Sequence, residues 1–258
     1  MTTITILGLG EAGRRYAHGL ARAGAQVRGY DPHRRLADPL VTQSARLEPA
    51  LTGTDVVLSL VAGHTAASVA GEALPFVPAG AVYADLNSGA PEVKRQIADA
   101  AAARGLLMAD AAVLAPVIRA GHRTPLLASG DGAGELARML TPLGVPIEVL
   151  DGAAGEAARL RLLRSVFMKG LAALALEGLG AARAADAEDW LRTQMAAELG
   201  PGGDELVERL VSGTPRHAER RLHEVRAAAA ELDALGAPSD MTRATLAWFE
   251  RLTAPREA

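Results

Sequence analysis

The 258-residue sequence contains no cysteine, and aromatic residues make up only 3% of it. Without cysteine the protein has no disulfide, no zinc site with thiolate ligands and no cysteine nucleophile. Lysine is nearly as scarce, because it occurs only at Lys94 and Lys169, and arginine supplies the other positive charges. A GC-rich genome accounts for the arginine content, which by itself is no sign of anion binding. A role that needs a lysine can fall on two positions only.

Long apolar runs and an excess of charge are also missing. The longest apolar stretch, residues 170–182, is interrupted by Glu177 and is shorter than the roughly 20 residues that span a membrane. The formal net charge of -3 gives no general attraction to nucleic-acid phosphates. The N-terminus shows no secretory signal pattern. We therefore expect a cytoplasmic protein that binds neither nucleic acid nor a membrane.

Short aliphatic runs alternate with helical patterns through the first 150 residues. Strict alternation of strand and helix predicts a parallel, doubly wound α/β sheet of the Rossmann type. The helix expected over residues 91–104 should have Ser88 as its N-cap and Pro91 in its first turn. The expected strands are residues 4–7, 26–30, 56–60, 81–84, 106–109, 126–128 and 147–150, and the expected helices are 12–23, 65–74 and 91–104.

The pattern changes after Asp151, where apolar residues recur only at helical spacing. One long helix is expected over residues 156–185, followed by helices over 190–199, 204–211, 214–235 and 240–252. The sequence therefore predicts a Rossmann domain over residues 1–150 and an all-helical substrate and dimerisation domain over 151–258.

A glycine-rich motif follows the first strand, with Gly8, Gly10 and Gly13 in the spacing GxGxxG. Bare backbone at these positions, together with Leu9, Glu11 and Ala12 between them, lets a dinucleotide pyrophosphate approach the start of a helix. Asp31 ends the second strand, 18 residues after Gly13, where a carboxylate can bind the adenosine ribose. Val61, after the third expected strand, is a further candidate cofactor contact. The alternative is that the glycines serve only a tight turn.

The acidic residue also bears on the choice of cofactor. A carboxylate at Asp31 repels the 2′-phosphate of NADP and favours NAD. Arg34 and Arg35 lie close enough in sequence to bind that phosphate, or they are solvated loop residues. The expected cofactor is NAD or NADP, with NAD favoured.

These segments resemble the β-hydroxyacid dehydrogenase superfamily, which includes 3-hydroxyisobutyrate and 6-phosphogluconate dehydrogenases. GLGEAG is similar to the family's GLGxMG, and the segment from Asp85 to Ser88, with Pro91, resembles its DxSTxxP motif. The resemblance implies that Asn87 and Ser88 line the substrate and nicotinamide pocket. The segment DAAVLAP, residues 110–116, matches the family's DAPVSGG only in part, so the usual carboxylate cradle is altered.

The start of the long helix carries the largest departure from the family. Where the family has GxxGxGxxxKxxxN, Gly152 and Gly155 match, whereas Arg161 replaces the catalytic lysine and Ser165 replaces the asparagine. Arginine stays protonated and is a poor proton shuttle, but its fork can hold two oxygen atoms. The resemblance therefore implies that Arg161 and Ser165 orient the substrate while the proton comes from elsewhere.

The C-terminal half is similar to the subgroup with a 6-phosphogluconate dehydrogenase C-terminal-like helical domain. Within residues 216–226, His217 and Arg221 are four residues apart on one expected helix. They are candidates for binding an anionic substrate, in their own chain or in a partner's, because the family implies a homodimer. The alternative is a solvated basic face. No histidine spacing is typical of metal ligands, and no metal is expected.

The glycine motif and the family resemblance together imply an NAD(P)-dependent dehydrogenase, and the resemblance implies hydride transfer between nicotinamide and a small, polar, anionic 3-hydroxyacid-like substrate. One alternative is an imine reductase, because C=N reduction needs less help from a general acid than ketone reduction does. The other is a dinucleotide-binding protein without turnover, which has kept the glycine motif and lost the chemistry at Arg161.

Overall fold

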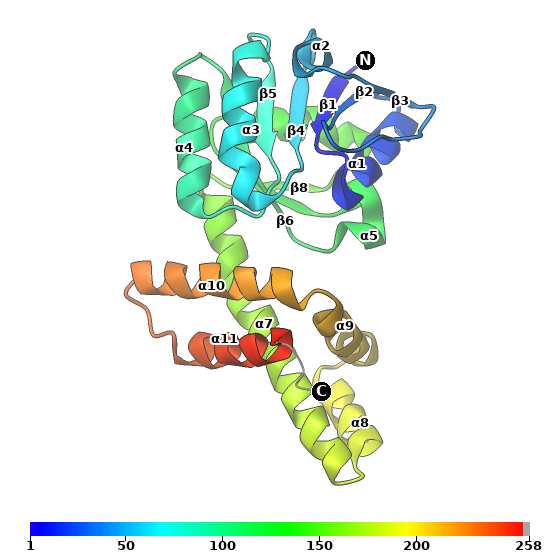
Figure 1. Cartoon of the computed structure of the whole chain (residues 1–258), viewed down its shortest axis with the longest axis vertical. Coiled ribbons are helices and arrows are strands. Elements are labelled where there is room, and N and C mark those ends of the chain that lie inside the picture. Colours follow the sequence, from blue (N-terminus) through cyan, green and yellow to red (C-terminus); the bar gives the residue numbers. More distant parts are fainter. Residues whose placement is uncertain (255–258) are drawn as a thin grey trace. The chain divides into compact units, whose positions relative to one another are not determined.

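The computed structural model describes residues 1–254 of the chain. The chain divides into two compact units, Met1–Arg161 and Leu162–Ala258, and the division falls inside the long helix α7 (Glu156–Ala184; Figure 1). The first unit is built on a sheet and the second is helical. This is the expected class, an α/β Rossmann fold followed by helices.

The first unit holds one eight-stranded sheet in the order β3-β2-β1-β4-β5-β6-β7-β8. Neighbouring strands are parallel except β6 and β7, which pair antiparallel. Strand order therefore reverses beside β1, the arrangement that binds dinucleotides at the carboxyl ends of the strands. The strands are β1 (Thr3–Leu7), β2 (Gln26–Tyr30), β3 (Val41–Gln43), β4 (Val56–Ser59), β5 (Val82–Asp85), β6 (Leu107–Val113), β7 (Leu126–Ser129) and β8 (Ile147–Val149).

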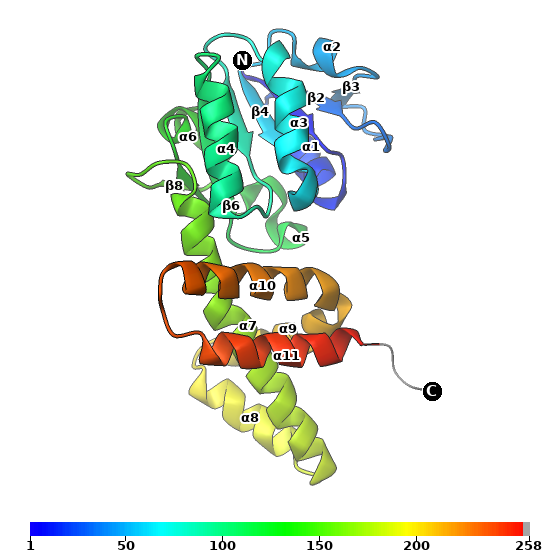
Figure 2. The ribbon, with the colours of Figure 1, turned by 60° about the vertical axis from the view of Figure 1, so that its left-hand side comes forward.

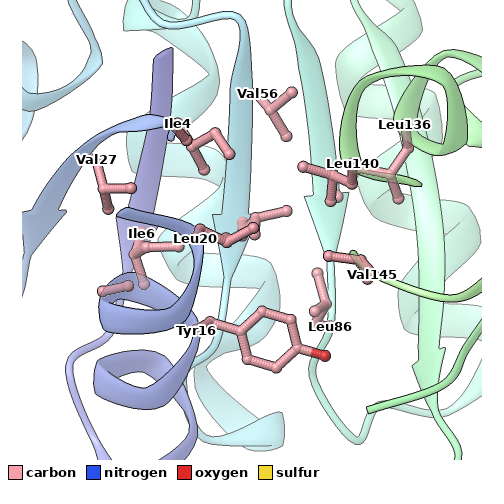
Figure 3. Close-up of a cluster of buried hydrophobic side chains, with 14 of the residues drawn as sticks. Ile4, Ile6, Tyr16, Leu20, Val27, Val56, Leu86, Leu136, Leu140 and Val145 are labelled. Carbon is pink, nitrogen blue, oxygen red and sulfur yellow. The ribbon is translucent and has the colours of Figure 1, made fainter. Parts of the chain in front are cut away.

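Both faces of the sheet are covered, which is why the central strands β1, β4 and β5 are mostly apolar and are buried at every position. On one face, Tyr16 and Leu20 of α1 and Leu136 and Leu140 of α6 pack against β-strand side chains such as Ile4 (Figure 3). A second core cluster joins the opposite face to α3 and α4. The α-helices of this unit are α1 (Glu11–Arg22), α2 (Leu47–Leu51), α3 (Ala66–Ala73), α4 (Pro91–Ala102), α5 (Val117–Ala120) and α6 (Ala133–Leu140).

Two predictions for the first unit are wrong in detail. Strands and helices do not alternate strictly, because β3 follows β2 without a helix between them. The pattern misses β3 since it has only three residues, two of them polar. Ser88 is not the N-cap of α4, whose N-cap is Ala90 in an extended conformation. A proline at the first helical position disfavours helical dihedrals at the residue before it, so the cap falls directly before Pro91.

The second unit contains the remainder of α7 and the helices α8 (Glu188–Glu198), α9 (Gly203–Arg216), α10 (Ala218–Ala234) and α11 (Asp240–Thr253). Helices α10 and α11 lie side by side (Figure 2), and Phe249 of α11 is fully buried with Ala173, Leu222 and Val225. The predicted break between residues 211 and 214 is wrong. Helix α9 continues to Arg216, and the break lies at His217, two residues after Pro215.

By length and composition alone, helix α7 could cross a membrane. This differs from the expectation based on residues 170–182, which are too few to span one. Only a third of its most apolar window is buried inside the structure. A core helix of a water-soluble protein passes the same criterion, so this feature is weak evidence for a membrane span.

Candidate dinucleotide and substrate site

The turn between β1 and α1 brings the three motif glycines together. Gly8 has a φ of +90°, and a Cβ atom there would lie 2.6 Å from the carbonyl oxygen of Leu60. A Cβ on Gly13 would overlap the carbonyl oxygen of Gly8. Gly10 differs, because a Cβ there meets nothing within 4 Å, and no side chain caps α1 at this position. The uncapped N–H groups beside Gly10, where Glu11 and Ala12 begin the helix, form an anion-binding end that suits a pyrophosphate.

Asp31 lies directly after β2, beside this turn. Its Oδ2 accepts a hydrogen bond from the Leu9 N–H at 2.8 Å. Its Oδ1 accepts bonds from the N–H groups of His33 at 2.9 Å and Arg34 at 3.0 Å. The carboxylate therefore orders the glycine turn and its own loop, while Arg34 and Arg35 are exposed. A dinucleotide bound at Gly10 would find Asp31 on the β2 side, where the adenosine ribose lies in this fold.

The loops after β4 and β5 are joined by Asn87. Its Oδ1 accepts a hydrogen bond from the Val61 N–H at 2.7 Å, and its Nδ2 donates to Ser59 Oγ at 2.9 Å and to Asp85 Oδ1. The Asn87 side chain is 5% exposed and both of its amide hydrogens are used internally. The adjacent Ser88 is exposed. Of the two predicted substrate residues, Ser88 offers its hydroxyl outward and Asn87 holds the loops.

Lys94 is a buried residue that the sequence motifs do not indicate. Its side chain is only 1% exposed and lies between two buried carboxylates. Its Nζ lies 3.1 Å from Asp110 Oδ1 and 3.4 Å from Asp85 Oδ2, and it donates to the Asp85 carbonyl oxygen at 2.8 Å. One signal was available in the sequence. Lys94 falls at helical spacing with Pro91 and Ile97, on the buried stripe of α4, and a lysine on an apolar stripe needs a buried partner.

The first turn of α7 is anchored by the sheet. Asp110 Oδ2 accepts hydrogen bonds from the N–H groups of Gly155 at 3.1 Å and Ala158 at 2.9 Å. Ser129 Oγ accepts one from the Ala157 N–H at 3.0 Å. Arg161, which follows within the next turn, is half-buried. Ser165 is four residues further along α7, inside the second unit, and is buried.

The other predicted substrate residues lie in the second unit. His217 is exposed at the break before α10, and its carbonyl oxygen accepts a hydrogen bond from the Arg221 N–H at 3.0 Å. Arg221 is half-buried and donates from Nη1 to Thr214 Oγ1. Burial lowers the pKa of the Arg221 guanidinium below its ordinary value. The two side chains therefore lie in different environments.

Lys169 is the second lysine of the chain, and it is also paired. Its Nζ lies 2.7 Å from Glu224 Oε2, with both side chains largely buried. Burial lowers the pKa of the Lys169 ammonium, and Glu224 opposes that shift. Within residues 1–254, no group of three histidine, aspartate or glutamate side chains is arranged to hold a metal ion.

Comparison with known proteins identifies the family of the chain. Residues 3–143 match the family model described as the NAD binding domain of 6-phosphogluconate dehydrogenase. The chain belongs to the β-hydroxyacid dehydrogenase superfamily. Residues 182–252 match a second model, described as a domain of unknown function, DUF1932. The superfamily assignment made from the motifs is therefore confirmed.

Two curated proteins are similar to this member of the β-hydroxyacid dehydrogenase superfamily. A 3-hydroxyisobutyrate dehydrogenase of Pseudomonas aeruginosa is 35% identical over 191 residues, which is 68% of this chain and 64% of that protein. An uncharacterized 28.5 kDa protein of Methanothermus fervidus is 30% identical over 172 residues, 67% of this chain and 65% of that protein. The matches thus span just under two thirds of the length of these relatives.

Solved structures of the superfamily share the fold over most of their length. A conserved hypothetical protein from Sinorhizobium meliloti has a TM-score of 0.76 and 33% identity, with 97% of this chain and 88% of that chain covered. A 3-hydroxyisobutyrate dehydrogenase from Salmonella typhimurium has a TM-score of 0.82 at 19% identity, with 97% and 94% covered. An imine reductase from Aspergillus terreus has a TM-score of 0.68 at 21% identity, with 97% and 93% covered. The last two show the fold alone.

Proposed function

We propose that this protein is an NAD(P)-dependent oxidoreductase that transfers hydride between nicotinamide and a small, anionic 3-hydroxyacid-like substrate. The observation that carries the proposal is the glycine turn at the start of α1, open at Gly10 and tied by Leu9 to the carboxylate of Asp31. The turn lies where strand order reverses in the sheet. A dinucleotide needs an uncapped helix end and an acidic residue on the next strand, and both are present.

Each of the named residues has a distinct part in this proposal. The N–H groups around Gly8, Gly10 and Gly13 bind the pyrophosphate and Asp31 binds the ribose. When bound, the nicotinamide supplies or accepts the hydride. Exposed Ser88 donates a hydrogen bond to the substrate, and Arg161 holds two of its oxygens through the guanidinium fork. Ser165, His217 and Arg221 remain proposed substrate residues of the helical unit.

The proton that accompanies the hydride needs a separate route. When a hydroxyacid is oxidised, the hydride leaves its carbon and the hydroxyl proton must pass to a base. Lys94 is enclosed between two aspartates and Lys169 is paired with Glu224. Arginine at position 161 does not release a proton at neutral pH. We therefore assign Arg161 a charge-stabilising part, with the proton passing to water.

NAD is the proposed cofactor in preference to NADP, because the Asp31 carboxylate lies where a 2′-phosphate would need a positive charge. We expect Asp31→Ala to weaken NADH binding by at least a few fold. The same change should weaken NADPH binding less, or strengthen it, since it removes the repulsion. Fluorescence titration with both cofactors measures this, and an unchanged NADH affinity would remove the ribose assignment.

Imine reduction is the second candidate, and one observation favours it. Both lysines of the chain are held in ion pairs, so neither is placed to protonate a ketone oxygen. An iminium carbon accepts hydride with less assistance, which fits a site whose charged group is Arg161. Similarity in fold to an imine reductase is compatible with this reading.

A titration followed by a substrate screen tests the proposal. NADH and NADPH are titrated first, and then 3-hydroxyacids, 2-ketoacids, sugar acids and cyclic imines are screened by the absorbance of the reduced cofactor. Turnover of hydroxyacids supports the main proposal, and turnover of imines alone supports the second. Tight binding without turnover of any class indicates a non-catalytic dinucleotide-binding protein. No binding of either cofactor contradicts all three.

The helical unit is proposed to form a homodimer with a second copy of the chain. The large apolar side chains of Phe167 and Leu174 on α7 are 66% and 63% exposed. They are seven residues apart and so lie on one helix face. Burial against a second copy would remove this apolar surface from water.

A further inference from the structure

We propose that Lys94 is a positioning residue that fixes the loops after β4 and β5, where the nicotinamide half of the dinucleotide binds. The inference rests on the proposed function, because it assumes a bound nicotinamide dinucleotide. It goes beyond that function by assigning a part to a buried side chain that touches neither cofactor nor substrate.

Burying the ammonium group of Lys94 costs desolvation free energy, which its ion pairs do not always recover. Its Nζ has the Asp85 carbonyl oxygen at 2.8 Å, Asp110 Oδ1 at 3.1 Å and Asp85 Oδ2 at 3.4 Å. All three side chains are almost fully buried. Replacing a buried ion pair by apolar residues of similar volume is often neutral or stabilising. Stability alone therefore does not account for this cluster, whereas a requirement for fixed geometry does.

The cluster leads to the cofactor loops through a chain of hydrogen bonds. Asp85 Oδ1 accepts from the N–H of Asn87 at 2.9 Å and from its Nδ2. Asn87 Oδ1 then accepts from the Val61 N–H at 2.7 Å. The ammonium holds the Asp85 carboxylate, the carboxylate holds the Asn87 amide, and the amide holds the loop after β4.

The loops after β4 and β5 meet at the end of this series of hydrogen bonds. A Cβ on Gly63, after β4, would lie 2.6 Å from the carbonyl oxygen of Ser88, after β5. A dinucleotide lies across the carboxyl ends of such a sheet, with the adenosine ribose at Asp31 on the β2 side. Its other nucleoside therefore extends over β4 and β5. The loops that Lys94 orders are thus the ones that receive the nicotinamide.

The start of α7 offsets part of the negative charge that remains in the cluster. Two carboxylates face one ammonium, and Asp110 Oδ2 also accepts from Gly155 and Ala158 at the start of α7. The helix N-terminus supplies roughly half a positive charge. Lys94 thereby also ties the cofactor loops to the turn that precedes Arg161.

Comparing the binding of two ligands distinguishes a positioning role of Lys94 from a general role in stabilising the fold. NADH carries the nicotinamide, whereas ADP-ribose has the same adenosine and pyrophosphate without it. We expect Lys94→Met to weaken NADH binding at least fivefold and to change ADP-ribose binding less than twofold. Isothermal titration measures both affinities. Lys169→Met is the matched control, because it removes the other ion-paired lysine, and it should change neither.

A double-mutant comparison tests whether Lys94 acts through Asn87. Asn87→Ala should weaken NADH binding selectively, and Lys94→Met combined with Asn87→Ala should be no worse than the larger single effect. Equal losses of NADH and ADP-ribose, or additive losses of NADH, would overturn the inference. If Lys94→Met fails to fold, the double variant Lys94→Met/Asp110→Asn is titrated instead, because the second change removes one of the carboxylates left unpaired by the first.

The wild-type protein separates this inference from the proposed function. If it binds neither NADH nor ADP-ribose, the proposed function fails. If it binds both and the Lys94 variant shows no selective loss of NADH, only the positioning role fails.

Discussion

Gly10 and Gly13 lie in the same turn, yet their surroundings give them different roles. Gly13 has the Gly8 carbonyl oxygen where its side chain would be, so its small size serves the packing of α1 against β1. Gly10 has open space on that side and ordinary backbone dihedrals, with φ of -66°. Under the proposed function, its small size leaves room for the pyrophosphate. The structure therefore distinguishes a glycine that packing requires from one that packing does not require.

The two alanine variants should separate accordingly. Gly13→Ala should lower the free energy of unfolding by about 1–3 kcal/mol, because the added methyl group overpacks the turn. Gly10→Ala should leave thermal stability unchanged and weaken NADH binding at least tenfold, because its methyl group occupies the space of the pyrophosphate. Calorimetry and NADH titration on both variants check this. Normal NADH affinity in Gly10→Ala would argue against pyrophosphate binding at this turn.

Arg161 should matter to turnover more than to cofactor binding. Loss of a charge-assisted hydrogen bond predicts that Arg161→Ala lowers kcat by about 10- to 100-fold with the substrate found in the screen. The dissociation constant of NADH should change little. Arg161→Lys is the informative companion, since faster alcohol oxidation in that variant would show that only a proton shuttle was lacking. Wild-type turnover in Arg161→Ala would exclude it from the site.

Some candidate site residues can be identified from the local sequence and others cannot, for a physical reason. The glycine spacing and Asp31 follow because each acts within a few residues of a strand end. Lys94, on helix α4, contacts residues on two strands, Asp85 of β5 and Asp110 of β6, which pair in register only once the sheet is formed. Asn87 was expected to face the substrate, but its amide is taken by Val61 and Ser59. Long-range pairing of this kind leaves no local pattern.

At the scale of elements, seven of the eight strands and the long helix α7 were predicted, whereas the strand β3 and the helices α2, α5 and α6 were not. The strand at Gln26–Tyr30 and the long helix from Glu156 agree with expectation to within a residue or so. The three-residue strand β3 lacks a sufficient apolar pattern. Helix α9 passes through Gly213, since its N-terminal turns are fixed by the buried Val207 and Leu210. Tertiary burial outweighs local helix-breaking tendency there.

Helix α7 provides the prediction at this scale. Glutamate at both Phe167 and Leu174 places charge on the exposed apolar stripe, and we expect it to convert the proposed dimer to a monomer. Sedimentation velocity measures the mass in solution. Met241→Glu is the control, because Met241 is an exposed apolar residue on α11, and it should leave the mass unchanged. If the double glutamate variant has the same mass in solution as the wild type, the apolar stripe is not a dimer interface.

At the scale of the whole molecule, the chain consists of two units, each with a buried apolar cluster of its own. The glycine turn, Asp31 and the loops after β4 and β5 all belong to the first unit. A ligand bound there stabilises the unit that holds it by mass action.

Calorimetry with NADH should therefore show an uneven response. At a free concentration of 100 times its Kd, NADH should stabilise the unit that binds it by about 2.7 kcal/mol. Where the units unfold in separate transitions, only one midpoint should rise. Gly10→Ala should show no shift at the same concentration. A single transition that rises as a whole would show that the units unfold as one.

The two lysines also have a practical consequence for following the protein's dynamics. Lys94 lies in the sheet unit and Lys169 in the helical unit, and both ammonium groups are shielded by carboxylates. Apart from the N-terminal amine, each unit thus carries one primary amine, protected while the unit is closed. A pulse of an amine-directed acylating reagent, resolved by peptide mass, reports local opening of each unit separately and without an introduced label.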